Sequence, residues 1–232
     1  MVGIMVDNEP EALIQIDSAA GDAKTKLILA GEILFAKNGL QGASMREIAS
    51  RGGQGNHFAV QYHFGSRDGL VKGIFDYRMQ QMEEVRCRML LRAEAAGRLK
   101  DARTLLDIVM LPQLELQDAD GNHSYASFLS QYLLQSRSPE FGDFGGELPP
   151  HLDRALKLLR ERVDYLPSHV AQRRLIGVSL MFLNILMRHH GVGQEEAAES
   201  FDEALEDTME QIVLAMCMPL RISNQALQLF KE

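Results

Sequence analysis

SMREIASRGGQGNHFAVQYHFGSRDGL, residues 44–70, contains two short helical segments joined by a glycine-rich turn. The first begins with Ser44-Met45-Arg46-Glu47, a capping box in which the serine oxygen accepts a backbone N–H and Glu47 reaches back. Gly52-Gly53-Gln54-Gly55 ends it, because three glycines in four residues are costly to hold helical. After the turn, Asn56 is a good N-cap for a helix from His57 to about His63. This layout predicts a helix-turn-helix unit.

A helix is expected on each side of this unit. Apolar residues near helical spacing predict the first from Asp22 to Asn38, and Gly39 supplies the left-handed residue that ends it. Ser66 is expected to cap a long fourth helix that runs to about Ala96 and ends at Gly97. Because about 45 residues are too few for a self-sufficient core, the unit must pack against that long helix.

The rest of the chain also shows helical periodicity and no alternating strand pattern. The further helices are expected at Ala102–Met110, around Tyr125–Leu133, at Leu152–Val163, at Ser168–His190 and at Glu195–Met218. The fold class is therefore all-α, with eight or nine helices. We expect a flexible leader at residues 1–21, a helix-turn-helix domain at 22–68 and a helical domain at 69–232.

Composition excludes several classes of protein. Two cysteines cannot build a disulfide scaffold or a four-thiolate zinc site. The N-terminus lacks the basic and apolar regions of a secretory signal. The most apolar run, Leu175–Met187, is interrupted by polar residues and flanked by arginines, so no membrane span is predicted. A reduced, cytoplasmic protein is the expectation.

The charge is unevenly distributed along the chain. The 232 residues carry a net charge of −8, and residues 1–21 hold four acids and no base. Residues 22–72 hold seven bases and four acids, so a basic segment of +3 lies inside an acidic protein. Local charge governs attraction at close range, and this segment therefore favours a polyanionic partner.

The same segment resembles the DNA-binding region of the tetracycline-repressor (TetR) family of bacterial transcription regulators. The most specific match is Tyr62-His63-Phe64-Gly65-Ser66-Arg67-Asp68-Gly69-Leu70, where the fourth helix starts. Weaker matches lie in Ile28 to Phe35, at Gly39 and in Ser44 to Ala49. The remaining helices have the family's number and order but carry no specific motif. The resemblance implies an N-terminal helix-turn-helix DNA-binding domain and a C-terminal helical ligand-binding and dimerisation domain.

The recognition helix departs from the family pattern. Gln54-Gly55-Asn56 stands where a Gly-Val-Ser turn is usual, and Phe58-Ala59-Val60-Gln61 where Gly-Thr-Leu-Tyr is usual. Gln61 thus replaces a phosphate-binding tyrosine, and Tyr62 follows it, so either could make that contact. The candidate DNA-binding residues are Ser44, Arg46, Asn56, His57, Phe58, Gln61, Tyr62 and Arg67.

Each candidate has a structural alternative. Arg67 is expected at phosphate, with a solvated ion pair as the alternative. Arg46 is either a phosphate contact or a surface arginine. Asn56 is a cap first and a base contact second. His57 and Phe58 suit a base edge and a thymine methyl, although Phe58 could equally pack in the core, and Gln61 could read adenine. His63 and Phe64 are expected to pack against the first and fourth helices.

Two further features concern ligand and partner. Flexible and aromatic apolar residues predict a pocket among the fifth to eighth helices for a small apolar effector, with Tyr125 as its polar group and a solid core as the alternative. The expected lining is Met110, Leu114, Tyr125, Phe128 and Phe182. A homodimer is expected through the last two long helices. Ser168–His190 is apolar nearly all round, and the final helix adds a stripe of Phe201, Leu205, Ile212 and Met216.

No catalytic motif, cofactor or metal is predicted. Neighbouring helical positions diverge by about 100°, so His189-His190 cannot easily share an ion. The sequence predicts a ligand-responsive transcriptional regulator that a small apolar effector releases from a palindromic operator, acting as a repressor. The alternatives are an all-helical protein-interaction scaffold and, less favoured, an enzyme with an apolar helical cavity.

Overall fold

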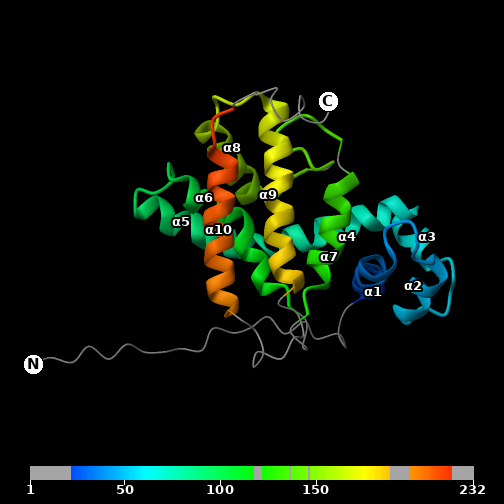
Figure 1. Ribbon diagram of the computed structural model, residues 1–232. Helices are drawn as coiled ribbons and strands as arrows, with labels where there is room; N and C mark the ends of the chain where they lie inside the picture. Colours follow the sequence, from blue (N-terminus) through cyan, green and yellow to red (C-terminus); the bar gives the residue numbers. More distant parts are fainter. Residues whose placement is uncertain (1–21, 118–121, 136, 146, 189–198, 221–232) are drawn as a thin grey trace, which may run out of the picture.

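The computed structural model describes residues 22–117, 122–135, 137–145, 147–188 and 199–220, and every regular element within them is helical (Figure 1). The all-α prediction is confirmed for these residues. The predicted leader at 1–21 and the pair His189-His190 lie outside them. The elements are α1 (Ala23–Asn38), α2 (Met45–Arg51), α3 (Ala59–Phe64), α4 (Arg67–Gln81), α5 (Glu83–Ala95), α6 (Ala102–Met110), the 3₁₀ helix η1 (Leu111–Glu115), α7 (Ser124–Gln135), α8 (Pro150–Arg162), α9 (Ser168–Arg188) and α10 (Phe201–Cys217).

Local signals place the first three helices. Asp22 caps α1 by accepting a hydrogen bond from the Thr25 amide at 2.8 Å. Gly39 ends α1 with φ +81°, a conformation that favours glycine, as the sequence predicts. In α1, Leu27 and Phe35 are fully buried, and the helix packs against α2, α4 and α7. The three helices therefore lean on the rest of the chain, as expected for so short a unit.

The predicted long fourth helix is wrong in one respect, because Met82 divides it into α4 and α5. The buried Arg86 side chain donates from Nη1 to the Met79 carbonyl at 3.2 Å. In a regular helix this carbonyl would accept a hydrogen bond from the backbone amide four residues later, that of Glu83, the first residue of α5. Here the Arg86 side chain donates to it instead. Ten α-helices result within the described residues, instead of the expected eight or nine.

The C-terminal helices surround the largest part of the core. Pro112 lies at the start of η1, where α6 stops as predicted. α9 and α10 run antiparallel and side by side (Figure 1).

α10 begins at Phe201, later than the predicted Glu195. Ser200 and Glu203 form its capping box, and residues 199–200 are not helical. Residues 195–198 lie outside the described part of the chain.

α9 is long and apolar enough, by length and composition alone, to cross a membrane. However, 44% of its most apolar window is buried inside the protein. Its buried residues include Leu175, Val178, Phe182 and Leu183, which face the core from one side of the helix. One side of α9 thus packs in the core of the protein.

One large hydrophobic cluster extends from α1 to α10. A buried ion pair crosses it: Arg78 on α4 donates to the Glu32 carboxylate on α1 from Nε at 2.6 Å and from Nη2 at 2.9 Å. Ser124 on α7 donates its hydroxyl to the same carboxylate at 2.6 Å. Glu32 thus joins three helices at a single point, and it links the N-terminal helices to the core.

Candidate nucleic-acid interface

The turn between α2 and α3 brings the two helices close together. Ser44 caps α2 through a bond from the Glu47 amide at 3.4 Å. Gly53 has φ +69°, and a Cβ built on Gly52 would lie 3.1 Å from Leu27 of α1. Small residues are therefore needed in this turn, for backbone conformation at Gly53 and for close packing at Gly52. The predicted helix-turn-helix layout is present in the structure.

α3 begins two residues later than the sequence suggested. It starts at Ala59, so His57 lies in the preceding turn and Asn56 is not the N-cap. The Asn56 side chain instead accepts a hydrogen bond from the Phe58 amide at 2.9 Å. Such an asparagine turn competes with helix formation, which explains the delayed start.

The outer face of α3 carries two exposed aromatic side chains. Ala59 and Val60 are buried, whereas Phe58 is 75% exposed and Tyr62 is 83% exposed. Phe58 and Tyr62 are four residues apart, and one helical turn places such residues on the same face. The core alternative for Phe58 is thereby excluded. Large exposed aromatics in one place are typical of an interaction surface.

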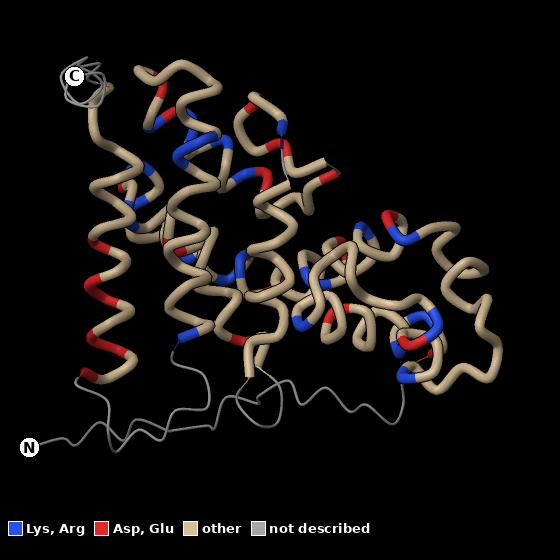
Figure 2. The backbone as a smooth tube through the Cα atoms, turned by 45° about the vertical axis from the view of Figure 1, so that its right-hand side comes forward, with Lys and Arg blue, Asp and Glu red and all other residues tan. Residues whose placement is uncertain are grey.

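We call the face formed by Ser44, Arg46, Asn56, His57, Phe58, Gln61 and Tyr62 the reading face. All seven residues are exposed. Arg46 forms no ion pair with any described residue, so its charge is available to a partner. Figure 2 shows basic residues on the N-terminal helices and a row of acids along α10. The exposed acids of α10 are Asp202, Glu203, Glu206, Asp207 and Glu210, and Arg103 of α6 pairs with Glu206 and Glu210.

The remaining candidate, Arg67, has an internal role. Its Nη1 donates to the Leu40 carbonyl at 2.8 Å, and its guanidinium lies 5.9 Å from the centre of the Phe35 ring. Arg67 therefore ties the start of α4 to the loop that precedes α2. A phosphate contact by the same side chain stays a prediction, and replacing Arg67 would affect stability as well as binding.

Phe64 is partly buried and packs as the sequence predicts. A Cβ built on Gly73 of α4 would lie 2.9 Å from its ring, and Lys24 of α1 lies over the ring at 5.9 Å. His63 is also partly buried and contacts the Tyr62 ring edge-on, with ring centres 5.0 Å apart. Phe64 therefore helps to hold α3 against α1 and α4.

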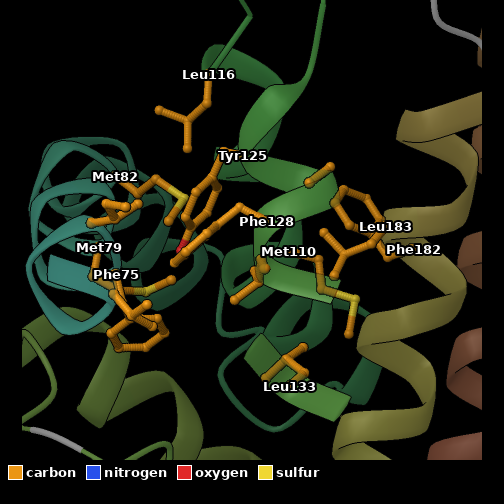
Figure 3. Close-up of a cluster of buried hydrophobic side chains, with 14 of the residues drawn as sticks. Phe75, Met79, Met82, Met110, Leu116, Tyr125, Phe128, Leu133, Phe182 and Leu183 are labelled. Carbon is orange, nitrogen blue, oxygen red and sulfur yellow. The ribbon is translucent and has the colours of Figure 1, made fainter. Parts of the chain in front are cut away.

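The predicted effector pocket falls within a cluster of buried hydrophobic side chains (Figure 3). Met110, Tyr125, Phe128 and Phe182 are each at most 1% exposed, and Leu114 is partly buried. The Tyr125 hydroxyl has no hydrogen-bond partner among the described residues. Burial, and secondarily the negative charge of Glu32, raises the pKa of Tyr125 far above its ordinary value. Tyr125 is therefore a protonated donor inside an apolar cluster.

Sequence reasoning missed Arg86, which is 1% exposed and lies beside this cluster. A charged residue in a helix is ordinarily read as solvated. The available signal was spacing, because Met79, Met82, Leu90 and Ala93 lie four or seven residues from Arg86 and are all buried. An arginine within such an apolar stripe is expected to be buried.

The described residues contain no group of three or more His, Cys, Asp or Glu side chains placed to hold a metal ion. Both cysteines, Cys87 and Cys217, are free and partly buried. Burial raises the pKa of the Cys217 thiol, which disfavours the reactive thiolate.

No protein-family model matches this chain, and no curated protein matches it. Among solved structures, the chain is similar to a crystal structure of a protein from Mesorhizobium loti described as a TetR-family transcriptional regulator. The sequences are 16% identical, the match covers 87% of this chain and 98% of the other, and the TM-score is 0.39. A likeness at that level does not place the chain in a family.

Proposed function

We propose that this protein is a ligand-responsive transcriptional regulator that binds double-stranded DNA through the reading face. The observation that carries the proposal is the exposure of Phe58, the N-cap of α3, and of Tyr62 on α3. They lie near a glycine turn and near Arg46, which forms no ion pair with any described residue. Exposed aromatics on the second helix of a helix-turn-helix suit a DNA major groove, and a cation on the first helix suits the neighbouring phosphates.

In this arrangement each reading residue has a distinct role. α3 enters the groove with its N-terminal end first, where Phe58 contacts a thymine methyl and His57 a base edge. Arg46 on α2 contacts the phosphate backbone, and Gln61 or Tyr62 contacts either phosphate or a base. Phosphate contacts fix the register of the protein, while base contacts select the sequence.

Regulation follows from a shift between two states of a homodimer. Two reading faces one groove turn apart bind a palindromic operator. A small apolar effector among Met110, Leu114, Tyr125, Phe128 and Phe182 changes the position of α4 and with it that spacing. The effector acts only through its different affinity for the two states. The protein represses transcription while it is bound to the operator, and the effector ends repression by releasing it.

The dimer is proposed through α9 and α10, with one correction to the sequence prediction. Ile212 and Met216 of the α10 stripe are 0% exposed and pack in the chain's own core. Because these two side chains are already buried within their own chain, they cannot form the dimer interface. The apolar side chains available to a partner include Leu180, Met181 and Ile185 of α9, which are partly exposed, and Leu214 of α10, which is 66% exposed.

A helical protein-interaction scaffold is the alternative function, since exposed aromatics also serve protein partners. The distribution of charge favours DNA, because basic residues lie on the helices around the reading face and acids lie on α10. Specific, salt-sensitive binding to duplex DNA in an operator selection tests the proposal. Absence of such binding would leave the scaffold.

Binding should weaken steeply with salt, and Arg46→Ala should make the dependence less steep. Each phosphate contact contributes about 0.9 to the slope of log K against log salt, so the variant should lose about that amount per subunit. Fluorescence anisotropy with a labelled operator between 50 and 200 mM salt, roughly the range in which such slopes are large, measures it. Arg92→Ala on α5 removes an equal charge from an exposed site outside the reading face and is the control. An unchanged slope for Arg46→Ala would remove this residue from the phosphate contacts.

Phe58→Ala should separate recognition from folding. Because the side chain is 75% exposed, stability in urea should change by no more than about 0.5 kcal/mol. Operator affinity should fall about tenfold, comparable to one misread base pair. Leu134→Ala, at a 60% exposed leucine of α7, is the matched control and should bind as the wild type does. Equal affinity of Phe58→Ala and Leu134→Ala would contradict the base contact.

A further inference from the structure

Arg86 on α5 presents one edge of its guanidinium to no oxygen acceptor among the described residues. Nη1 donates to the Met79 carbonyl at 3.2 Å and to Glu83 at 3.3 Å. Nη2 faces only the sulfur atoms of Met79 and Met82, at 3.9 and 3.5 Å. Nε has no hydrogen-bond partner. Leaving such donors unpaired in a buried position is costly, and an apolar replacement would avoid the cost.

Arg78 shows what this edge binds when it is occupied. Its Nε and Nη2 donate side by side to the two oxygens of Glu32, at 2.6 and 2.9 Å. This paired geometry is the usual one between arginine and a carboxylate. Arg86 offers the same two nitrogen atoms in the same core, with methionine sulfur in place of a carboxylate.

Glu83 does not complete the Arg86 site, because its carboxylate is held elsewhere. It accepts the His151 amide at 2.9 Å and the Leu152 amide at 3.2 Å, both at the start of α8. His151 Nδ1 also lies 2.9 Å from it. Glu83 is therefore fixed by the N-terminus of α8, where a negative charge is favoured, and it touches Arg86 only through Nη1.

Tyr125 supplies a second buried donor at the same place. Its hydroxyl is unpartnered among the described residues, and Figure 3 shows it directed from α7 toward Met79 and Met82. Arg86 Nη2 contacts the sulfur atoms of the same two methionines. The aromatic ring stacks against Phe128, with centres 5.9 Å apart. Two unsatisfied donors thus meet among apolar and easily displaced side chains.

We propose that the Nε and Nη2 edge of Arg86 and the Tyr125 hydroxyl bind the carboxylate of an apolar monocarboxylic acid, whose body lies among Met79, Met82 and Phe128. Its role as effector rests on the proposed function. A single negative charge matches the single free edge, whereas a phosphate dianion would bring a second charge into the apolar core without a partner. The unbranched methionines can move aside to admit the acid.

Thermal denaturation of the full chain tests the site. The probes are hexanoate, octanoate, decanoate and 4-butylbenzoate, each compared with the corresponding alcohol. At least one acid should raise Tm by several degrees while its alcohol does not, because a ligand that binds only the folded state stabilises it. A shift as large with the alcohol, or no shift with any of the acids, would overturn the proposal.

Two variants separate a binding role from a structural one. Tyr125→Phe removes an unpartnered hydroxyl, so the ligand-free protein should melt about 2–4 °C higher, while the affinity for the acid falls at least tenfold, that is, by about 1.4 kcal/mol or more. Arg86→Lys keeps the charge but loses the paired donors, and should bind the acid equally poorly. If Tyr125→Phe binds the acid with wild-type affinity, the site does not exist. This measurement is decisive even if Arg86→Lys fails to fold.

DNA binding in the presence of the acid distinguishes the two proposals. If the acid binds but leaves operator affinity unchanged, the site stands and its role as effector is overturned. If the protein binds an operator with the expected salt dependence while none of the acids binds, the regulator stands and the Arg86 site is overturned.

Discussion

Glu32→Ala is expected to destabilise the protein by about 3–5 kcal/mol. The change leaves Arg78 charged and 4% exposed, and a buried charge without its partner is strongly unfavourable. It also removes the acceptor that Ser124 uses on α7. Urea denaturation at fixed protein concentration measures the effect, since the stability of a dimer depends on concentration.

Two controls make the result specific to burial. The double change Glu32→Leu with Arg78→Met should recover most of the loss, because an apolar pair can replace a buried ion pair at little cost. Asp76→Ala breaks the exposed pair with Lys72, which lies at 2.6 Å, and should alter stability by less than about 1 kcal/mol. A cost for Glu32→Ala as small as that of Asp76→Ala would refute the structural role of this junction.

Ile185→Glu is expected to give a folded monomer that has lost the full operator. Ile185 is only partly buried on α9, so a charge there should remain solvated in one chain but be unfavourable inside a dimer interface. Losing one of two linked reading faces should weaken operator binding by at least about 100-fold. Sedimentation and anisotropy measure the two effects.

Leu183→Glu is the contrasting variant on the same helix. Leu183 is 0% exposed, so this change places a carboxylate in the core and should prevent folding instead of dimerisation. A wild-type protein that sediments as a monomer at micromolar concentration would contradict the dimer, and the two-headed mechanism would fail with it.

The sequence predicted best where a structure depends on nearby residues. Ser66 and Gly39 were placed correctly because a cap or a left-handed residue acts within one helical turn. The break at Met82 was missed because neither glycine nor proline marks it. The Met79 carbonyl near this break accepts from the Arg86 side chain, and Arg86 is itself buried. The spacing of apolar residues around Arg86 indicates that it is buried, but it does not mark the end of a helix.

The candidate site shows the same division. Phe58 could be assigned to either the core or the surface from its spacing, and only the packed structure places it outside. Arg67 was expected at the surface, but its guanidinium bonds to the Leu40 carbonyl, 27 residues earlier in the chain. Tyr125 is buried with an unpartnered hydroxyl, and its predicted role as the polar group of an effector pocket stays a prediction. Arg86 was missed because its burial depends on which face of α5 packs against the core.

Acids on α10 are separated from bases on the N-terminal helices. Ionic strength therefore determines how many of these charges interact with an approaching DNA duplex. In dilute buffer the Debye length is about 30 Å, so the whole net charge of −8 contributes a repulsion to the approach of DNA. Near physiological ionic strength this length shrinks to about 8 Å, and an approaching duplex responds to the nearest surface alone. The acidic remainder then repels DNA only from the wrong orientations, so it aligns the encounter without preventing it.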